Sequence, residues 1–179
     1  MANNFIVLDL ETSGLSPVRH SMLSLGAVDF ATGKEFYGEC RAYVNREVCR
    51  GALEVNGFTL DQIEDKKKPL PHELYLQFVE WVRQNQLEKT LAGHNIGSFD
   101  VGFLKQIHES YKEYYPAEFG EWPFGHRFID LHSVFFAKYG RSLKMDEILQ
   151  TLGLPSEPKP HNALTGAKCE RDAFKILLN

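Results

Sequence analysis

The beginning of the chain consists of short apolar runs separated by turns. The run FIVLDL at residues 5–10 contains isoleucine and valine, as strands buried on both faces usually do. Two more runs, at residues 21–30 and 34–44, are joined through the glycine-containing turn ATG. This pattern predicts three consecutive strands.

Helical spacing begins further along. Leu74, Phe78 and Val82 recur every four residues behind Pro71, which suits the first turn of a helix. The pattern then predicts a short strand over residues 90–95 and an amphipathic helix over residues 99–114.

The stretch at residues 114–128 is rich in aromatic residues, proline and glycine. It predicts a structured loop that leads into a strand ending near Asp130. Its aromatic rings either stack on nucleic-acid bases or, more simply, pack the loop onto the core. Helical patterns follow at residues 131–140 and 142–153, each ended by a glycine.

The remaining residues predict a turn at SEPKP, residues 156–160, and a final helix from about Ala163 to Leu178. Strands that first follow one another and then alternate with helices indicate an α/β protein with one mixed sheet and helices packed on it. With neither an internal repeat nor a composition typical of a linker, residues 1–179 are expected to form a single domain.

The charge balance limits the partners. The 179 residues carry a formal net charge of −4, with a pI near 6.0, whereas proteins that bind duplex nucleic acid over many phosphates usually have a basic face. The basic cluster Lys66–Lys68 precedes a proline and is interpreted as a solvated turn. An acidic protein can still act on nucleic acid if bound metal ions supply the positive charge.

The location is predicted from what the sequence lacks. No signal-peptide pattern and no apolar run long enough for a membrane span is present. The three cysteines are an odd number without CxxC spacing, which indicates neither a disulfide framework nor a zinc site. A cytoplasmic protein without a membrane partner is therefore expected.

Two acids on the first strand are the first candidates for chemistry. Asp9 and Glu11 lie two residues apart, so both side chains leave the same face of the strand. Apolar neighbours keep water away, and two like charges in such a place either raise one pKa steeply or hold a cation between their oxygens. A solvated strand end is the alternative for an isolated pair.

A third acid and a histidine strengthen the case. Ser98 can cap the helix that follows, which leaves Asp100 in the first turn, where the helix dipole favours a carboxylate. His161 follows two prolines that restrict its loop, and a histidine can take a proton from water at neutral pH.

Together these stretches resemble the DEDD family of 3′-to-5′ exonucleases, in the histidine branch that includes RNase T and the bacterial polymerase proofreading subunit. The family motif DxETTGL is matched at residues 9–15, AHNxxFDxxFL at residues 93–104, and HxALxDA at residues 161–167. The motifs stand in the family's order, and the resemblance covers nearly the whole chain.

The resemblance implies a ribonuclease H-like, five-stranded mixed sheet with helices on both faces, and two divalent metal ions, Mg2+ or Mn2+. Asp9, Glu11 and Asp100 would be metal ligands and His161 the general base. The substrate would be the 3′ end of single-stranded DNA or RNA, and a DNA polymerase is a candidate partner. The implied substrate-binding residues are Leu10, Thr12, Ser13, Leu15, Asn95 and Phe99.

Two departures from the family pattern stand out. HNIGSFD has one residue more than the family's HNxxFD, which Gly97 is expected to absorb as a bulge or in a longer turn. Gly166 stands where the family has its fourth metal-binding aspartate. We predict that Glu170, one helical turn later on the same face, replaces that ligand and that the glycine clears its path.

The alternative is that the ligand is simply lost, which would leave a catalytically impaired nucleic-acid-binding or polymerase-associated module. The presence of His161 favours the enzyme, because a binding module has no need of a base beside the acids. The choice between DNA and RNA stays open at this point, because discrimination between them rests on fine contacts to the 2′-hydroxyl. The oligomeric state is open as well.

Overall fold

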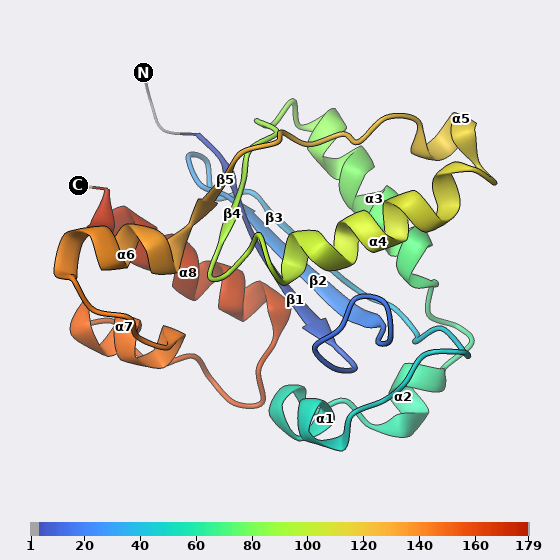
Figure 1. Cartoon of the computed structure of the whole chain (residues 1–179), viewed down its shortest axis with the longest axis horizontal. Helices are drawn as coiled ribbons and strands as arrows, with labels where there is room; N and C mark the ends of the chain where they lie inside the picture. The colour runs from blue at the N-terminus through green and yellow to red at the C-terminus, as the bar shows by residue number, and fades with distance from the viewer. Residues whose placement is uncertain (1–3, 179) are drawn as a thin grey trace.

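A computed structural model describes residues 4–178. One five-stranded sheet lies at its centre, in the order β3-β2-β1-β4-β5 (Figure 1). β1 pairs antiparallel with β2 and parallel with β4, so the sheet is mixed as predicted. The strands are β1 Ile6–Thr12, β2 Met22–Asp29, β3 Glu35–Glu39, β4 Leu91–Gly93 and β5 Phe128–Asp130.

Helices cover both faces of this sheet (Figure 1). α3 and α4 lie on one face, and α6, α7 and α8 lie on the other, while α1 and α2 lie beyond the carboxyl end of β1. The helices are α1 Arg50–Asn56, α2 Leu60–Glu64, α3 Pro71–Gln84, α4 Asp100–Lys112, α5 Pro116–Phe119, α6 Leu131–Tyr139, α7 Met145–Thr151 and α8 Ala163–Leu177.

The alternation of side chains along β1 creates two cores. Ile6, Leu8 and Leu10 pack with α3 and α4, whereas Phe5 and Val7 pack with α6, α7 and α8. Since successive side chains leave opposite faces of a strand, the second face continues from Val7 to the two acids of β1. The same alternation that builds the cores therefore presents those acids toward α8.

The third strand is shorter than predicted. It ends at Glu39, because the chain beyond Cys40 leaves β2: the N–H of Arg41 donates to Pro69 O and that of Ala42 donates to Ile63 O. Hydrogen bonds to α2 and to the segment between α2 and α3 replace those of the sheet. The apolar residues beyond Glu39 thus belong to a loop that packs on the core, and not to a strand.

A crevice opens where β1 and β4 separate. Their register comprises only Ile6 with Leu91 and Val7 with Ala92, so β1 continues five residues past its last partner in β4. At this point the strand order reverses, and such points at the carboxyl ends of parallel strands are common binding sites in α/β proteins. Among residues 4–178, no helix is long and apolar enough to cross a membrane.

Candidate active site

Asp9 and Glu11 leave the same face of β1, as their spacing predicts, and α8 packs on that face. In the antiparallel register they stand opposite Gly26 and Ser24 of β2. A β-carbon on Gly26 would overlap the backbone of Ala163 and Leu164, so the glycine lets the first turn of α8 lie directly on the sheet. This close approach brings α8 over the two acids.

Asp100 reaches the site from the other side of the crevice. It is the first residue of α4, and its Oδ1 accepts a 3.0 Å hydrogen bond from the N–H of Leu10. That N–H is available because β1 has no strand partner at this position on the β4 side. The prediction that Ser98 caps α4 is wrong: the N-cap is Phe99, and Ser98 Oγ donates to the carbonyl of Asn95 instead.

The extra residue in HNIGSFD is accommodated by a longer turn, but not through Gly97. Asn95 takes the left-handed conformation, with φ +57°, which asparagine tolerates better than most residues. The N–H groups of Ser98 and Phe99 both donate to Asn95 O, and Ile96 is fully buried beneath the turn. The turn therefore keeps Asn95 exposed and Asp100 buried.

Glu170 is buried in the middle of α8 and extends toward the end of β4. Its Oε1 accepts a 3.1 Å hydrogen bond from the N–H of His94. Its Oε2 is buried and has no hydrogen-bond partner among the described residues. Glu170 thus lies on the Asp100 side of the cluster, with one carboxylate oxygen free to bind a cation.

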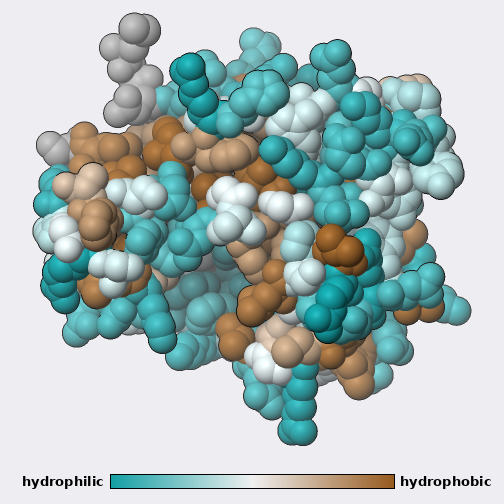
Figure 2. Space-filling model, in the orientation of Figure 1, coloured by the Kyte–Doolittle hydropathy of each residue, from teal (hydrophilic) through white to brown (hydrophobic). Residues whose placement is uncertain are grey.

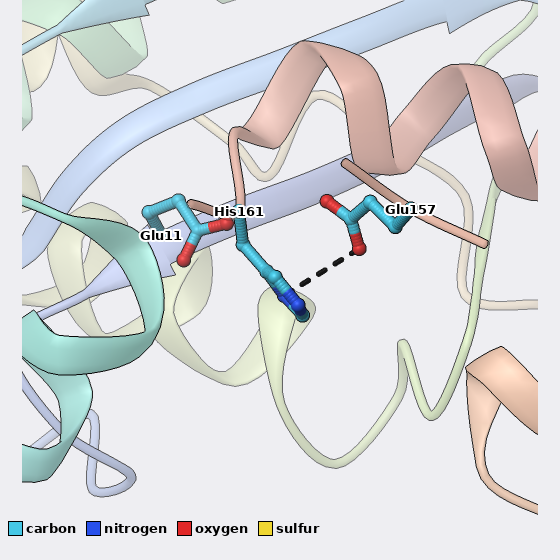
Figure 3. Close-up of side chains that lie close together, drawn as sticks. All are labelled: Glu11, Glu157 and His161. Carbon is cyan, nitrogen blue, oxygen red and sulfur yellow. Dashed lines mark ion pairs between the residues drawn. The ribbon is translucent and has the colours of Figure 1, made fainter. Parts of the chain in front are cut away.

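His161 lies beside Glu11 and Glu157, on the loop that leads into α8 (Figure 3). Its Nδ1 is 3.5 Å from Oε2 of Glu157, a residue of the predicted SEPKP turn. One nitrogen or oxygen from each of Glu11, Glu157 and His161 lies within 4.8 Å of the other two. The loop therefore brings a fifth acid to the site.

These side chains line a cleft of about 720 Å3, and the molecular surface is hollowed between the regions of α7 and α1 (Figure 2). Five of the six predicted substrate-binding residues also line it: Leu10, Thr12, Leu15, Asn95 and Phe99. Leu15, with 82% exposure, is open to a ligand. The rest of the wall includes Cys49, Ala52, Val55 and Asn56 from α1 and its N-cap, and Met145 from α7.

Ser13 differs from the prediction. Its side chain is fully buried and does not line the cleft. The hydroxyl donates to Glu47 O and accepts from the N–H of Ser21, so it joins two loops. Since both its donor and an acceptor site are used inside the protein, Ser13 holds the turn after β1 rather than contacting a substrate.

Burial and mutual repulsion raise the pKa values of these acids. Burial, followed by Glu170 and Asp100, raises the pKa of Asp9 well above its usual range. Burial and then Glu157 raise the pKa of Glu11 to about 7. Burial likewise raises the pKa of Asp100, against the hydrogen bond from Leu10, and that of Glu170. Each carboxylate is costly to ionise here without a neighbouring cation.

The donor set fits hard divalent cations. Among residues 4–178, the cleft is lined by five carboxylates and by no lysine or arginine. Glu157 Oε1 and Glu170 Oε2 are buried without a hydrogen-bond partner among those residues. Oxygen ligands with negative charge and a free lone pair are what Mg2+ and similar ions bind, so bound cations would give these two oxygens the partners that they lack.

Sequence reasoning missed Glu157 and the wall formed by α1. The stretch SEPKP was predicted only as a turn, and no role was predicted for the residues that form α1. One signal was available, since Glu157 lies four residues before His161 in a loop that contains Pro155, Pro158 and Pro160. A loop so rich in proline has few conformations, and an acid within it has a defined position.

A family model described as exonuclease, RNase_T, matches residues 6–169. The chain therefore belongs to the exonuclease family, and the predicted class of enzyme is confirmed. The match extends from β1 into α8 and so includes every acid of the cleft except Glu170. The alternative of an impaired binding module is disfavoured, because the cleft keeps a full set of carboxylates despite the glycine at position 166.

Two relatives illustrate the range of this family. The 3′-5′ DNA exonuclease Cap18 from Escherichia coli is 29% identical over 181 residues, which is 97% of this chain and 90% of that protein. The PolC-type DNA polymerase III of Bacillus cereus is 32% identical over 102 residues, which is 56% of this chain but only 7% of the polymerase.

The fold agrees with solved structures. The nuclease domain of 3′hExo, a DEDDh family member bound to rAMP, superposes with a TM-score of 0.74 at 16% identity and covers 98% of this chain and 91% of that one. The predicted ribonuclease H-like sheet with helices on both faces is thereby confirmed.

Proposed function

We propose that this exonuclease removes nucleoside monophosphates from single-stranded 3′ ends by hydrolysis at a centre of two divalent metal ions, Mg2+ or Mn2+. The observation that carries the proposal is the convergence of acids from β1, α4 and α8 in a cleft lined, among the described residues, by no lysine or arginine. Asp9, Glu11, Asp100 and Glu170 are the ligands we assign. Bound metals would stabilise the attacking and leaving oxygens of a phosphodiester displacement.

Residues of the chain supply the general base and the contacts to the terminal nucleotide. His161 accepts the proton of the attacking water while the water oxygen bonds to phosphorus. The bond from phosphorus to the 3′ oxygen breaks, and that oxygen takes up a proton from solvent to become the new 3′-hydroxyl. With 30% side-chain exposure, the ring is at the edge of the cleft, where it can exchange that proton with solvent. Asn95, Phe99 and Leu15 all line the cleft, and we assign them to the terminal nucleotide.

We propose DNA as the principal substrate. Cap18, which is similar over almost the whole chain, is a DNA exonuclease, and this likeness supports the assignment. The similarity to part of PolC supports a DNA polymerase as a candidate partner. We place the protein in the cytoplasm, because Cys40, Cys49 and Cys169 are all free thiols, as expected in a reducing compartment.

A panel of oligonucleotides labelled at the 5′ end tests the proposal. Single- and double-stranded DNA and RNA are incubated with Mg2+, Mn2+ or EDTA, and the products are separated by length. We expect a ladder that shortens from the 3′ end, fastest on single-stranded DNA and absent in EDTA. Cleavage in EDTA would contradict the metal centre, whereas faster degradation of RNA would contradict the choice of substrate.

A further inference from the structure

The space beside Gly166 is already occupied by two carboxylates. A β-carbon at this position would overlap Oδ2 of Asp9 and would lie 2.9 Å from Asp9 Cγ and 3.3 Å from Oε1 of Glu157. The three nearest atoms thus belong to Asp9 and Glu157. The predicted reason for the glycine, clearing a path for Glu170, is therefore replaced by another: it makes room for these two side chains.

Glu157 is placed as a ligand would be. Its side chain is 9% exposed, and Oε1 is buried without a hydrogen-bond partner among the described residues. Burying a carboxylate oxygen without a partner costs free energy unless a cation or a proton neutralises it. The other oxygen, Oε2, faces Nδ1 of His161 at 3.5 Å, so the free oxygen points into the cleft toward Gly166 and Asp9.

The loop that carries Glu157 is held in position. The N–H of His161 donates to Val55 O in α1. At the end of the same helix, a β-carbon on Gly57 would lie only 2.7 Å from Pro160, so the loop packs directly against that turn. Contacts to α1 on one side and the start of α8 on the other fix where the Glu157 carboxylate lies.

We propose that Glu157, from the loop before α8, supplies the metal-binding carboxylate that the family pattern places at position 166 of the helix. This inference rests on the proposed function and deepens it. Glu157 coordinates on the side of Glu11, whose carboxylate belongs to the same 4.8 Å cluster. Glu170 keeps its place on the side of Asp100, at the end of β4. The carboxylate thus comes from the loop before α8 instead of from the helix itself, and Gly166 leaves the space that Glu157 needs.

The first test measures Mn2+ affinity of the full chain by electron paramagnetic resonance. Glu157→Gln keeps the shape of the side chain but removes its charge, and we expect Mn2+ to bind about 10-fold or more weakly. Asp172→Asn on α8 removes one charge at a side chain that is 53% exposed, and it should leave the affinity unchanged. Thermal unfolding in EDTA checks that each variant folds.

The second test is a rescue. Gly166→Asp alone should weaken Mn2+ binding, because the new side chain would crowd Asp9 and Glu157. Glu157→Ala should weaken it as well. The double variant Glu157→Ala, Gly166→Asp removes the contact with Glu157 and leaves space into which the Asp9 carboxylate can shift. It also restores the family arrangement, so its Mn2+ affinity should exceed that of either single variant. Failure of the double variant to exceed Glu157→Ala would count against the exchange of ligands.

A positioning role gives a different result. If Glu157→Gln binds Mn2+ like the wild type while the pH profile of hydrolysis shifts, Glu157 only orients His161 and the proposal is overturned. Because the readout is Mn2+ affinity, it separates this inference from the proposed function. A wild type that binds Mn2+ through Glu157 but degrades no oligonucleotide would contradict the function and not the ligand.

Discussion

The N–H of Leu10 donates a 3.0 Å hydrogen bond to Oδ1 of Asp100, a residue 90 positions further along the chain. This bond joins the strand that carries Asp9 and Glu11 to the first turn of α4, and it does so at the point where β1 has lost β4 as its partner. One side chain therefore closes an open strand edge and completes the acidic cluster.

Two substitutions of Asp100 separate these roles. Asp100→Asn keeps an oxygen for the Leu10 N–H, so we expect the metal-free protein to be at least as stable as the wild type at pH 8. Asp100→Ala leaves that buried N–H unpaired and should be less stable than Asp100→Asn by about 1 to 3 kcal/mol. Both should lower hydrolysis by about 100-fold or more. Urea unfolding in EDTA measures the stability of each variant, and oligonucleotide cleavage with Mn2+ measures its activity. Equal stability of Asp100→Asn and Asp100→Ala would refute the role of the hydrogen bond to the Leu10 N–H.

Gly166→Ala should separate activity from stability. Alanine favours the helix by roughly 0.8 to 1 kcal/mol over glycine, but its β-carbon would overlap Asp9 Oδ2 and displace that carboxylate. We expect a folded protein with activity reduced by about 10-fold or more. The matched control is Gly102→Ala in α4, where the nearest atom to a β-carbon is Pro17 Cγ at 3.7 Å. That variant should be stabilised and fully active, and equal activity of the two would disprove the crowding.

His161→Ala removes the proposed base without removing a carboxylate. We expect the rate of cleavage to fall by about 100-fold or more, in the range for loss of a general base, with Mn2+ affinity unchanged. Single-turnover kinetics at saturating Mn2+ measure the rate. A loss of Mn2+ binding would instead identify the imidazole ring as a metal ligand. The assay distinguishes the two roles, because His161 lies in one cluster with Glu11 and Glu157.

The raised pKa of Glu11 predicts how the metal-free protein responds to pH. Its pKa is about 7 when folded and about 4.3 when unfolded, so the folded state binds more protons between these values. The contribution of this group to stability is therefore full below about pH 4.3 and is lost as pH rises through 7. The free energy of unfolding in EDTA should decline over this range more in the wild type than in Glu11→Gln. Parallel curves for the two proteins would refute the shift, and Mn2+ affinity should rise over the same range as protons leave.

Glu170→Gln tests the carboxylate that α8 contributes to the cleft. An amide oxygen can still accept from the His94 N–H, so the fold should persist. Loss of the charge should weaken Mn2+ binding and lower activity, because a neutral amide is a poorer ligand for a hard cation. Asp172→Asn on the exposed side of α8 again serves as the control. A fully active Glu170→Gln would restrict Glu170 to its hydrogen bond with His94.

Much of this protein could be predicted from local patterns. The period of two along β1 places Asp9 and Glu11 on one face, whatever the strand packs against. The apolar spacing of α3, α4 and α8 identified these helices, and the motif order identified Asp100 and His161 as members of one site. These features depend on residues close to one another in sequence, or on a resemblance that covers the whole chain.

Tertiary structure alone decided the rest. The third strand ends at Glu39 because the residues after Cys40 donate hydrogen bonds to α2 and to the loop that follows it. Ser13 turns inward because its hydroxyl donates to Glu47 O and accepts from the N–H of Ser21. Glu157 reaches the cluster through a loop whose path depends on contacts with α1, and the purpose of Gly166 depends on which side chains arrive beside it. Helix and strand periods say where a side chain points from its own backbone, whereas the position of a loop carboxylate is set by segments more than a hundred residues away in the sequence.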